Sequence, residues 1–179
     1  PDGSLGPLYL AGALEDAGFE TDILDASVGP KEENLKNTFY RNVKQPNGLI
    51  RIGMSREQIE EYIARGGYTI VGINSNFTPQ TNMALEVAAA VKGADPNILV
   101  IVGGISARNI SEYFLDSGNV DVVCLTEGEK IITCIAEQQR LGMGFEQVPG
   151  VMYKKGSGYA RNPVGQADIY TNLDQLPFP

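Results

Sequence analysis

The sequence contains no histidine and no tryptophan, and only two of its 179 residues are cysteines. The absence of histidine removes the commonest general base of enzymes and the commonest transition-metal ligand, and it excludes serine hydrolysis by a histidine-dependent triad. Cys124, in an apolar run, and Cys134, on an expected helix, fit neither a disulfide framework nor a metal-ligand spacing. We therefore expect buried structural thiols, and we predict no catalytic residue and no metal ligand in this chain.

Positive charge is also scarce, because 14 Lys and Arg stand against 22 Asp and Glu, for a net charge of -8. Such a chain repels a phosphate backbone, so we expect no nucleic-acid partner. The sequence has no apolar run of the roughly 20 residues that span a bilayer, and no signal-like leader opens it. These features predict a cytoplasmic protein that does not contact membranes. Neither G-x-x-x-x-G-K-[ST] nor a G-x-G-x-x-G between strand and helix occurs, so phosphate-cradling nucleotide sites lack support.

Short β-branched runs alternate with amphipathic helical patterns along most of the chain. Apolar residues at helical spacing predict a helix over residues 8–17 that stops at Gly18, and alternation over residues 19–25 predicts a strand. This order of elements is typical of βαβ units and predicts an α/β fold with a parallel sheet covered by helices on both faces. The other expected elements are a helix that Ser55 and Gln58 open with a capping box and that runs to Gly66-Gly67, strands over 69–74, 98–102 and 120–125, and helices over 80–92, 108–117 and 129–141.

The remaining segments predict the domain organisation. Residues 27–54 show no periodicity and indicate an irregular insertion, such as a lid or a partner surface, within an α/β domain over residues 1–148. The stretch "GVMYKKGSGYARNP" predicts a β-hairpin appendage over residues 149–165, and the proline-rich residues 166–179 resemble an interdomain linker. The chain opens with a turn and a helix, whereas a βα series normally begins with a strand, so we expect a further strand upstream.

Ligands of open parallel sheets bind at the carboxyl ends of the strands, which makes the loops after the strands informative. Four loops stand out: "PDGSLGP" before the first helix, "NSNFTP" after strand 69–74, "GGISARN" after strand 98–102 and "TEGE" after strand 120–125. Gly103-Gly104 permits close approach of the backbone to a ligand, while Ser75, Asn76 and Thr78 offer uncharged hydrogen bonds beside the flat ring of Phe77. Together the loops suit a large, mostly neutral and partly planar ligand.

Each of these features also has a plain structural explanation. The Gly-Gly pair is typical of a tight βα turn, Ser75 or Thr78 is suited to capping the following helix, and acidic residues in "TEGE" favour a helix N-terminus. Taken singly, each loop favours that structural interpretation. Their coincidence at one edge of the expected sheet favours a shared ligand site.

The ordered segments "GPLYLAGALEDAGFETDILDAS", "VGINSNFTPQTNMALEVAAAVK", "ILVIVGGISARN" and "VDVVCLTEGE" resemble the N-terminal cobalamin-binding domain of cobalamin-dependent radical SAM enzymes. The spacing of "SNF" at 75–77 and "GG" at 103–104 is similar to the S-x-L and G-G parts of such domains. The resemblance covers about residues 3–135 and the tail. Anaerobic magnesium-protoporphyrin ester cyclases and related methyltransferases are among the enzymes that this chain resembles. The C-x-x-x-C-x-x-C cluster motif of the radical SAM barrel does not occur in this chain.

The resemblance implies a flavodoxin-like, Rossmann-like domain that binds and orients cobalamin. In the full-length protein it implies an iron-sulfur cluster, S-adenosylmethionine and a C-terminal radical SAM domain that carries out methyl transfer or related radical chemistry. Ser75 and Phe77 are then expected to line the channel for the benzimidazole tail. The full set of cofactor-binding residues implied is Ser4, Leu5, Gly6, Leu8, Ser75, Asn76, Phe77, Thr78, Gly103, Gly104, Ile105, Ser106, Thr126, Glu127, Gly128 and Glu129.

One departure from related domains concerns the lower face of cobalt. The methionine-synthase type of domain carries a D-x-H-x-x-G motif, but the first loop here has Ser4 two residues after Asp2. Histidine ligation is therefore excluded, and residues 2–8 are our candidates for covering that face. Two other interpretations remain open: a flavodoxin-like sensor that does not bind cobalamin, and an interaction module in which residues 27–54 carry the function.

Overall fold

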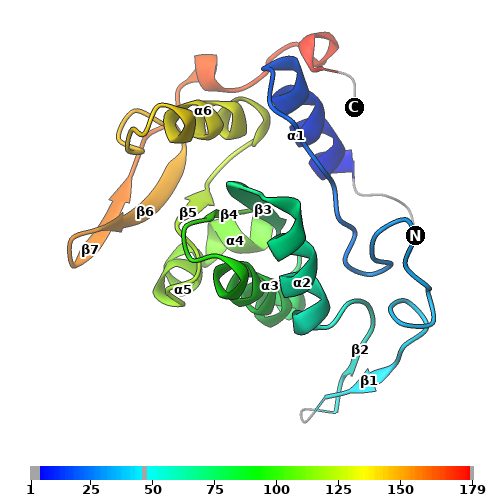
Figure 1. Ribbon diagram of the computed structural model, residues 1–179. Coiled ribbons are helices and arrows are strands. Elements are labelled where there is room, and N and C mark those ends of the chain that lie inside the picture. The colour runs from blue at the N-terminus through cyan, green and yellow to red at the C-terminus, as the bar shows by residue number, and fades with distance from the viewer. Residues whose placement is uncertain (1–4, 46–47, 178–179) are drawn as a thin grey trace.

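The structure, a computed structural model, describes residues 5–45 and 48–177 of the chain. Its centre is a five-stranded sheet with helices on both faces, which confirms the predicted α/β class (Figure 1). The strands lie in the order β3-β4-β5-β6-β7. Their bounds are Ile70–Asn74 for β3, Leu99–Gly103 for β4, Val122–Cys124 for β5, Val151–Lys155 for β6 and Gly158–Arg161 for β7.

The first three strands of the sheet are parallel, as predicted. β3 pairs with β4 from Ile70 opposite Leu99 to Asn74 opposite Gly103, and β4 pairs with β5 in the same sense. The predicted hairpin also forms, but β6 pairs antiparallel with β5, so the hairpin extends the main sheet and is not a separate appendage. Pairing with β6 covers the edge of β5, which would otherwise expose unpaired backbone groups.

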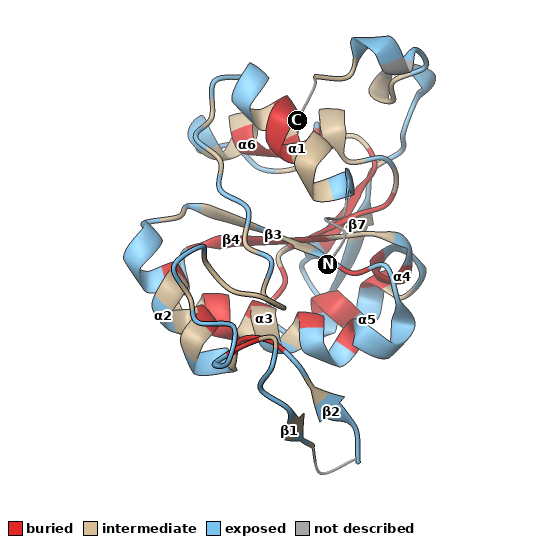
Figure 2. Ribbon diagram, turned by 90° about the vertical axis from the view of Figure 1, so that its right-hand side faces the viewer, coloured by how far each residue is buried: buried red, intermediate tan, exposed pale blue. Residues whose placement is uncertain are grey.

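Two layers of helix enclose the sheet. One face carries α2 (Arg56–Gly66), α3 (Thr81–Ala94), α4 (Ile105–Asn109) and α5 (Ser111–Asp116), and the opposite face carries α1 (Leu5–Asp16) and α6 (Glu129–Arg140). Buried residues concentrate in β4 and on the helix faces turned toward the sheet (Figure 2). Alternate residues of β4 enter the two cores, because successive side chains of a strand point to opposite faces.

Local signals set the ends of α2 as predicted. The Ser55 side chain accepts a hydrogen bond from the Gln58 backbone N–H, and the Gln58 side chain accepts one from the Ser55 backbone N–H. Gly67 follows the helix in the left-handed conformation, with φ of 64°. The predicted helix over 108–117, in contrast, is divided at Ile110 into α4 and α5.

The predicted strand over residues 19–25 is wrong, because this segment pairs with no strand in the described part of the chain. Its position is fixed by side chains. The Asp22 carboxylate accepts hydrogen bonds from the hydroxyls of Tyr62 (2.5 Å) and Tyr68 (2.6 Å), and the two rings stack. These hydrogen bonds, that of Tyr62 first, lower the pKa of Asp22, and they anchor the segment to α2 and to the start of β3.

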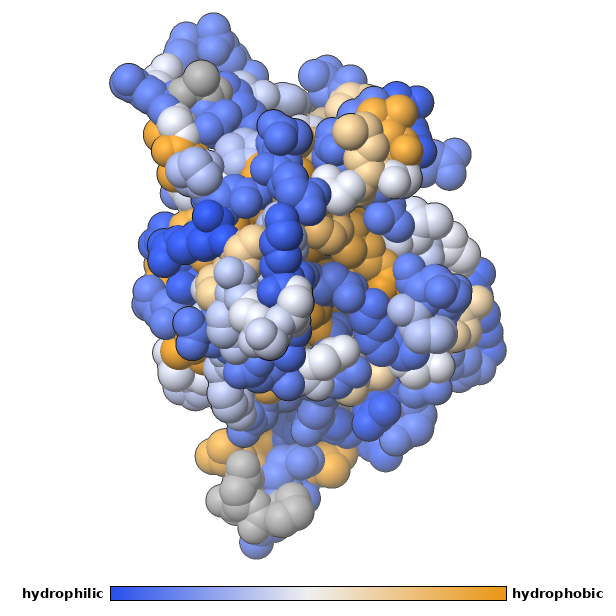
Figure 3. Space-filling model, turned by 90° about the vertical axis from the view of Figure 1, so that its left-hand side faces the viewer, coloured by the Kyte–Doolittle hydropathy of each residue, from blue (hydrophilic) through white to orange (hydrophobic). Residues whose placement is uncertain are grey.

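The predicted insertion over residues 27–54 is mostly irregular but contains a small antiparallel pair, β1 (Val43–Lys44) with β2 (Ile50–Arg51). Apolar side chains are exposed at this end of the molecule, among them Leu49 at 63% and Ile50 at 61% exposure (Figure 3). Two short 3-10 turns, Gln166–Asp168 and Leu173–Gln175, follow the hairpin. Within the described ranges, none of the helices combines the length and apolar character that crossing a bilayer requires.

The amino ends of the parallel strands are held together by a partly buried ionic contact. Lys92 Nζ on α3 donates to the Asp121 carboxylate at 2.7 Å and to the Ile98 carbonyl at 2.7 Å. The same Asp121 oxygen accepts the backbone N–H of Val100 at 2.7 Å. One lysine and one aspartate therefore link α3 to the starts of β4 and β5.

Candidate functional site

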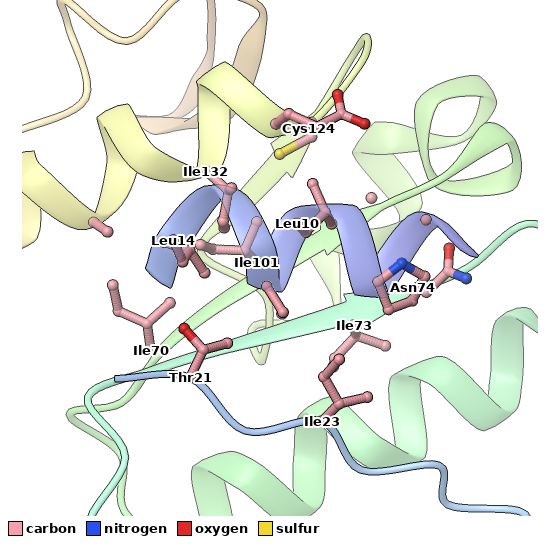
Figure 4. Close-up of a pocket in the computed structure, with 18 of the residues that line it drawn as sticks. Leu10, Leu14, Thr21, Ile23, Ile70, Ile73, Asn74, Ile101, Cys124 and Ile132 are labelled. Carbon is pink, nitrogen blue, oxygen red and sulfur yellow. The ribbon is translucent and has the colours of Figure 1, made fainter. Parts of the chain in front are cut away.

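A cavity of about 1530 Å³ lies between the sheet and the layer formed by α1 and α6, and it opens at the carboxyl ends of the parallel strands. All four predicted loops contribute to it, with Gly6 in the first turn of α1, Asn76 after β3, Gly104 after β4 and Glu127 after β5. Its inner part is apolar, and Figure 4 shows Leu10 and Leu14 from α1 facing Ile101, Cys124 and Ile132 across it. The predicted convergence of these loops is thus confirmed.

Nine of the sixteen predicted site residues line this cavity, namely Gly6, Asn76, Gly103, Gly104, Ile105, Thr126, Glu127, Gly128 and Glu129. Six others are described but do not line it: Leu5, Leu8, Ser75, Phe77, Thr78 and Ser106. Ser4 lies outside the described residues. Phe77 is 65% exposed and not enclosed by any loop, so contact between its ring and a bound cofactor stays a prediction.

Ser75 directly follows β3 and is buried, at 1% exposure. It lies on the same side of the sheet as Val71 and Ile73, which pack toward α2 and α3. Its backbone carbonyl accepts the N–H of Ser106 at 3.1 Å, which ties the end of β3 to α4. Among the described residues, its Oγ has no hydrogen-bond partner, and an unsatisfied buried hydroxyl is costly. The hydroxyl of Ser106, in contrast, lies 3.3 Å from that of Thr81.

The two glycines after β4 have different roles. Gly104 has φ of 101°, and a Cβ there would lie 2.5 Å from Asn76 Oδ1 and 2.6 Å from the Ser75 carbonyl oxygen. Gly103 has an ordinary backbone, and its only neighbour within 4 Å of such an atom is Cys124 Cβ at 3.8 Å. Gly104 is therefore required by the protein's own packing, whereas Gly103 leaves open space at the cavity wall.

A third glycine lets α1 approach α6. A Cβ on Gly128, at the start of α6, would lie 2.8 Å from Leu10 Cδ2 of α1. This close contact holds α1 against α6 where both helices line the cavity. The "TEGE" loop thus contributes to the site through packing as well as through its acidic side chains.

Several lining residues were absent from the sequence prediction, chiefly Asn74, Arg108 and the apolar side chains of α1 and α6. Alternation along β3 is the signal that identifies Asn74, because residues 74 and 76 point to one face and residue 75 to the other. Leu10 and Leu14 lay on the predicted apolar face of the first helix. No sequence signal distinguished Arg108 from other exposed basic residues.

Five of the described acidic residues line the cavity, Glu15, Glu20, Asp22, Glu127 and Glu129, whereas the wall around Ile101 and Ile132 is apolar. Arg108 is the one basic residue among the described residues that line it, while Glu127 and Glu129 stand at the mouth. Burial raises the pKa of the Cys124 thiol to about 12, so this group stays neutral at physiological pH. The inner surface therefore suits an uncharged, apolar group.

The family model for the B12 binding domain matches residues 3–136, three quarters of the chain. The chain belongs to the B12-binding domain family. Among curated proteins, it is 27% identical over 157 residues to cytidylyl-2-hydroxyethylphosphonate methyltransferase from Streptomyces wedmorensis, a match that covers 86% of this chain and 28% of that protein.

Two solved structures share the fold of this B12-binding domain. The radical S-adenosylmethionine methyltransferase TsrM from Kitasatospora setae, with cobalamin and a [4Fe-4S] cluster bound, matches with a TM-score of 0.69 and 21% identity over 92% of this chain and 27% of that one. The cobalamin-dependent S-adenosylmethionine radical enzyme OxsB, with aqua-cobalamin bound, matches with a TM-score of 0.56 and 20% identity over 64% of this chain and 16% of that one. The chain thus spans less than a third of each relative's length and resembles the cobalamin domains of radical SAM methyltransferases.

Proposed function

We propose that this domain holds cobalamin at the carboxyl ends of β3, β4 and β5 and orients it toward a radical SAM domain of the same polypeptide. The observation that carries the proposal is the convergence of the start of α1 and the loops after β3, β4 and β5 on one cavity in a B12-binding domain. Cobalamin, when bound, supplies a cobalt centre that carries a methyl group between donor and acceptor, while the protein supplies binding and orientation.

The residues of the cavity fit the cofactor's tail. Its benzimidazole is a flat, apolar and uncharged group, and the space between Leu10 on α1 and Ile101 on β4 is apolar. Gly103 presents no side chain to this space, so a planar group can approach the end of β4 closely. The amides of Asn74 and Asn76 stand at the mouth, where a corrin carries hydrogen-bonding side chains.

The role within a longer protein follows from the relatives. The curated relative is a methyltransferase and TsrM is a radical S-adenosylmethionine methyltransferase, and the present chain corresponds to 28% of the former and 27% of the latter. We infer that the full-length protein is a radical SAM methyltransferase or a cyclase-type oxidoreductase with an iron-sulfur cluster and S-adenosylmethionine. In that reaction this chain binds and orients the cobalamin, and it supplies no catalytic side chain.

Titration of the purified domain with hydroxocobalamin tests the proposal, with binding followed in the visible spectrum and by equilibrium dialysis. We expect saturable binding of one equivalent, weakened at least tenfold in Gly103→Val, because the valine side chain enters the open space beside Cys124. Gly158→Val, in β7, is the control, since it makes the same change in a strand remote from the cavity. Absence of saturable binding, or equal loss in both variants, would contradict the proposed site.

A further inference from the structure

Charge is distributed unevenly along the chain. Residues 34–56, which we call the basic segment, contain five of the 14 Lys and Arg and none of the 22 Asp and Glu. Residues 15–25, which we call the acidic segment, contain five Asp and Glu and neither Lys nor Arg. From residue 57 onward both signs are interspersed. Two blocks of opposite charge therefore follow each other closely in the sequence.

The charges of these blocks are not neutralised within the described part of the chain. There, the basic segment contributes one ion pair, between Arg51 and Glu86 at 3.5 Å, and the acidic segment contributes none. The exposed basic residues without an ion pair include Lys36, Arg41 and Lys44. These side chains are therefore available to a charged partner.

Both segments also place charge where the adjoining helix end opposes it. Glu15 and Asp16 end α1, although the negative end of a helix dipole disfavours carboxylates there. Arg56 begins α2, where the positive end of the dipole disfavours a cation. A partner that brings positive charge to the end of α1 and negative charge to the start of α2 would offset both conflicts.

Exposed apolar side chains accompany the charges in both segments. In the basic segment Tyr40 is 67% exposed, and Ile50 on β2 is similarly open to solvent. In the acidic segment Ile23 is 44% exposed. Apolar side chains with charged residues around them are typical of a surface that binds another protein.

The basic segment is anchored to the domain at its base. The buried hydroxyl of Thr38 donates to the Val28 carbonyl at 2.7 Å, and the Thr38 carbonyl accepts the Gly53 backbone N–H at 3.2 Å. β1 and β2 pair within the segment. A surface that is already ordered loses little conformational entropy on binding.

The two segments lie next to each other on the folded domain. The Met54 backbone N–H donates to the Ala26 carbonyl at 2.8 Å, which joins the end of the basic segment to the residue after the acidic one. Figure 1 shows the chain running from the end of α1 along one side of the molecule to β1 and β2. A surface with a positive half beside a negative half is self-complementary when a second copy is rotated by a two-fold axis.

We propose that the basic segment, residues 34–56, binds the acidic segment, residues 15–25, of a second copy of this chain in a two-fold symmetric dimer. Each contact then forms twice, with Lys and Arg of one copy opposite Asp and Glu of the other. The chain itself carries the acidic and apolar complement that the basic segment requires. None of the described residues of the basic segment lines the cavity, so the proposal does not depend on cobalamin binding.

Sedimentation velocity of the 179-residue chain at increasing concentration tests the proposal. We expect a dimer whose dissociation constant rises at least tenfold between about 50 mM and about 500 mM NaCl, because salt screens the contact. Reversal of three charges in the basic segment should weaken the dimer at least tenfold: Lys36→Glu, Arg41→Glu and Lys44→Glu. The control makes the same change in net charge outside both segments and should leave the dimer unchanged: Arg140→Glu, Lys155→Glu and Arg161→Glu.

A charge exchange identifies the partner segment. A second variant reverses the acidic segment and should also be monomeric: Glu15→Lys, Asp16→Lys and Glu20→Lys. Lysine near the end of α1 agrees with the helix dipole, so this variant should fold, as circular dichroism verifies. We expect an equimolar mixture of the two reversed variants to form a heterodimer, because each segment again meets the opposite charge. Failure of the folded variants to associate in the mixture would overturn the proposal.

Other results would also overturn it. A chain that stays monomeric at about 100 µM in low salt has no dimer contact of useful strength. A dimer that is insensitive to salt and to both reversals uses another surface. Binding of the monomer to vesicles of phosphatidylcholine and phosphatidylglycerol, lost when the basic segment is reversed, would assign that segment to an anionic bilayer. Each of these results would leave the proposed cofactor site intact.

Discussion

Gly104 and Ser75 are packed so closely that a Cβ on Gly104 would lie 2.6 Å from the Ser75 carbonyl oxygen. The same carbonyl accepts the backbone N–H of Ser106. The turn after β4 is therefore built around the end of β3, independently of any ligand. A loss of cofactor binding in a Gly104 variant consequently reports on protein folding, and Gly103 is the better probe of the cavity.

This difference predicts unequal effects on stability. We expect Gly104→Ala to lower the free energy of unfolding by about 2–3 kcal/mol, because it adds both a clash and an unfavourable positive φ. Gly103→Ala should change it by less than about 1 kcal/mol. Chemical denaturation of both variants measures the difference, and equal stability would show that the turn is more adaptable than its packing indicates.

The unpartnered hydroxyl of Ser75 gives a second prediction. Ser75→Ala should leave the domain equally stable or make it more stable by up to about 1 kcal/mol, since it removes an unsatisfied buried group. Ser106→Ala, which loses the partner of Thr81, should destabilise it by about 1 kcal/mol. Thermal unfolding compares the two, and a large loss in Ser75→Ala would mean that its Oγ has a partner in solution.

Asp22 predicts a dependence of stability on pH. Hydrogen bonds from Tyr62 and Tyr68 lower its pKa below 3.8, so their stabilising effect is complete above that value and is lost as pH falls through the lowered pKa. Asp22→Asn should therefore be about 1 kcal/mol less stable than the parent at pH 7 and indistinguishable from it near pH 2. Urea titrations over this range measure the gap, and a gap independent of pH would exclude a role for the charge.

The position of Arg108 in the cavity wall leads us to expect that it binds the cofactor's phosphate. As the only basic residue among the described lining residues, it is suited to the single negative charge of the nucleotide tail. We expect Arg108→Ala to weaken cobalamin binding about tenfold, equivalent to 1.4 kcal/mol. Binding of cobinamide, which lacks the nucleotide, should be unaffected. Arg161→Ala on β7, outside the residues that line the cavity, is the control. Equal losses for cobalamin and cobinamide would show that Arg108 does not bind the phosphate.

The absence of histidine predicts the spectrum of bound cobalamin. With its own base held in the cavity, the cofactor cannot obtain an imidazole from this chain. Electron paramagnetic resonance of the bound cobalt(II) form should therefore lack the triplet splitting that an axial nitrogen produces. Clear triplets would show that the cofactor keeps its own base on cobalt, and the proposed position of the tail would then be wrong.

Features encoded by a few adjacent residues were predictable from the sequence. Ser55 and Gln58 set the start of α2 and Gly67 its end, because capping bonds and positive φ depend only on neighbouring residues. Residues 19–25 were mispredicted because alternation shows that a segment can pair but not that a partner lies beside it. The break at Ile110 was missed because neither Gly nor Pro marks it.

The site was predictable at the level of loops but not of every side chain. Topology places the four loops at one edge, so their convergence followed from the order of elements. The side of the sheet to which a side chain points depends on its position in the strand, and a shift of one residue sends every side chain to the opposite side. Asn74 therefore lines the cavity beside the predicted Asn76, whereas Ser75 does not line it. The proximity of Arg108 depended on how the short helix α4 turns.

The contact between Lys92 and Asp121 fixes the end of the sheet that lies away from the four loops. It clamps the amino ends of β4 and β5 to α3, whereas the opposite ends of these strands run into loops with glycine at 103, 104 and 128. Close packing of Gly104 against Ser75 and of Gly128 against Leu10 holds that opposite end. The frame around the cavity is therefore set by contacts within the protein, so a cofactor can enter or leave without realigning the strands.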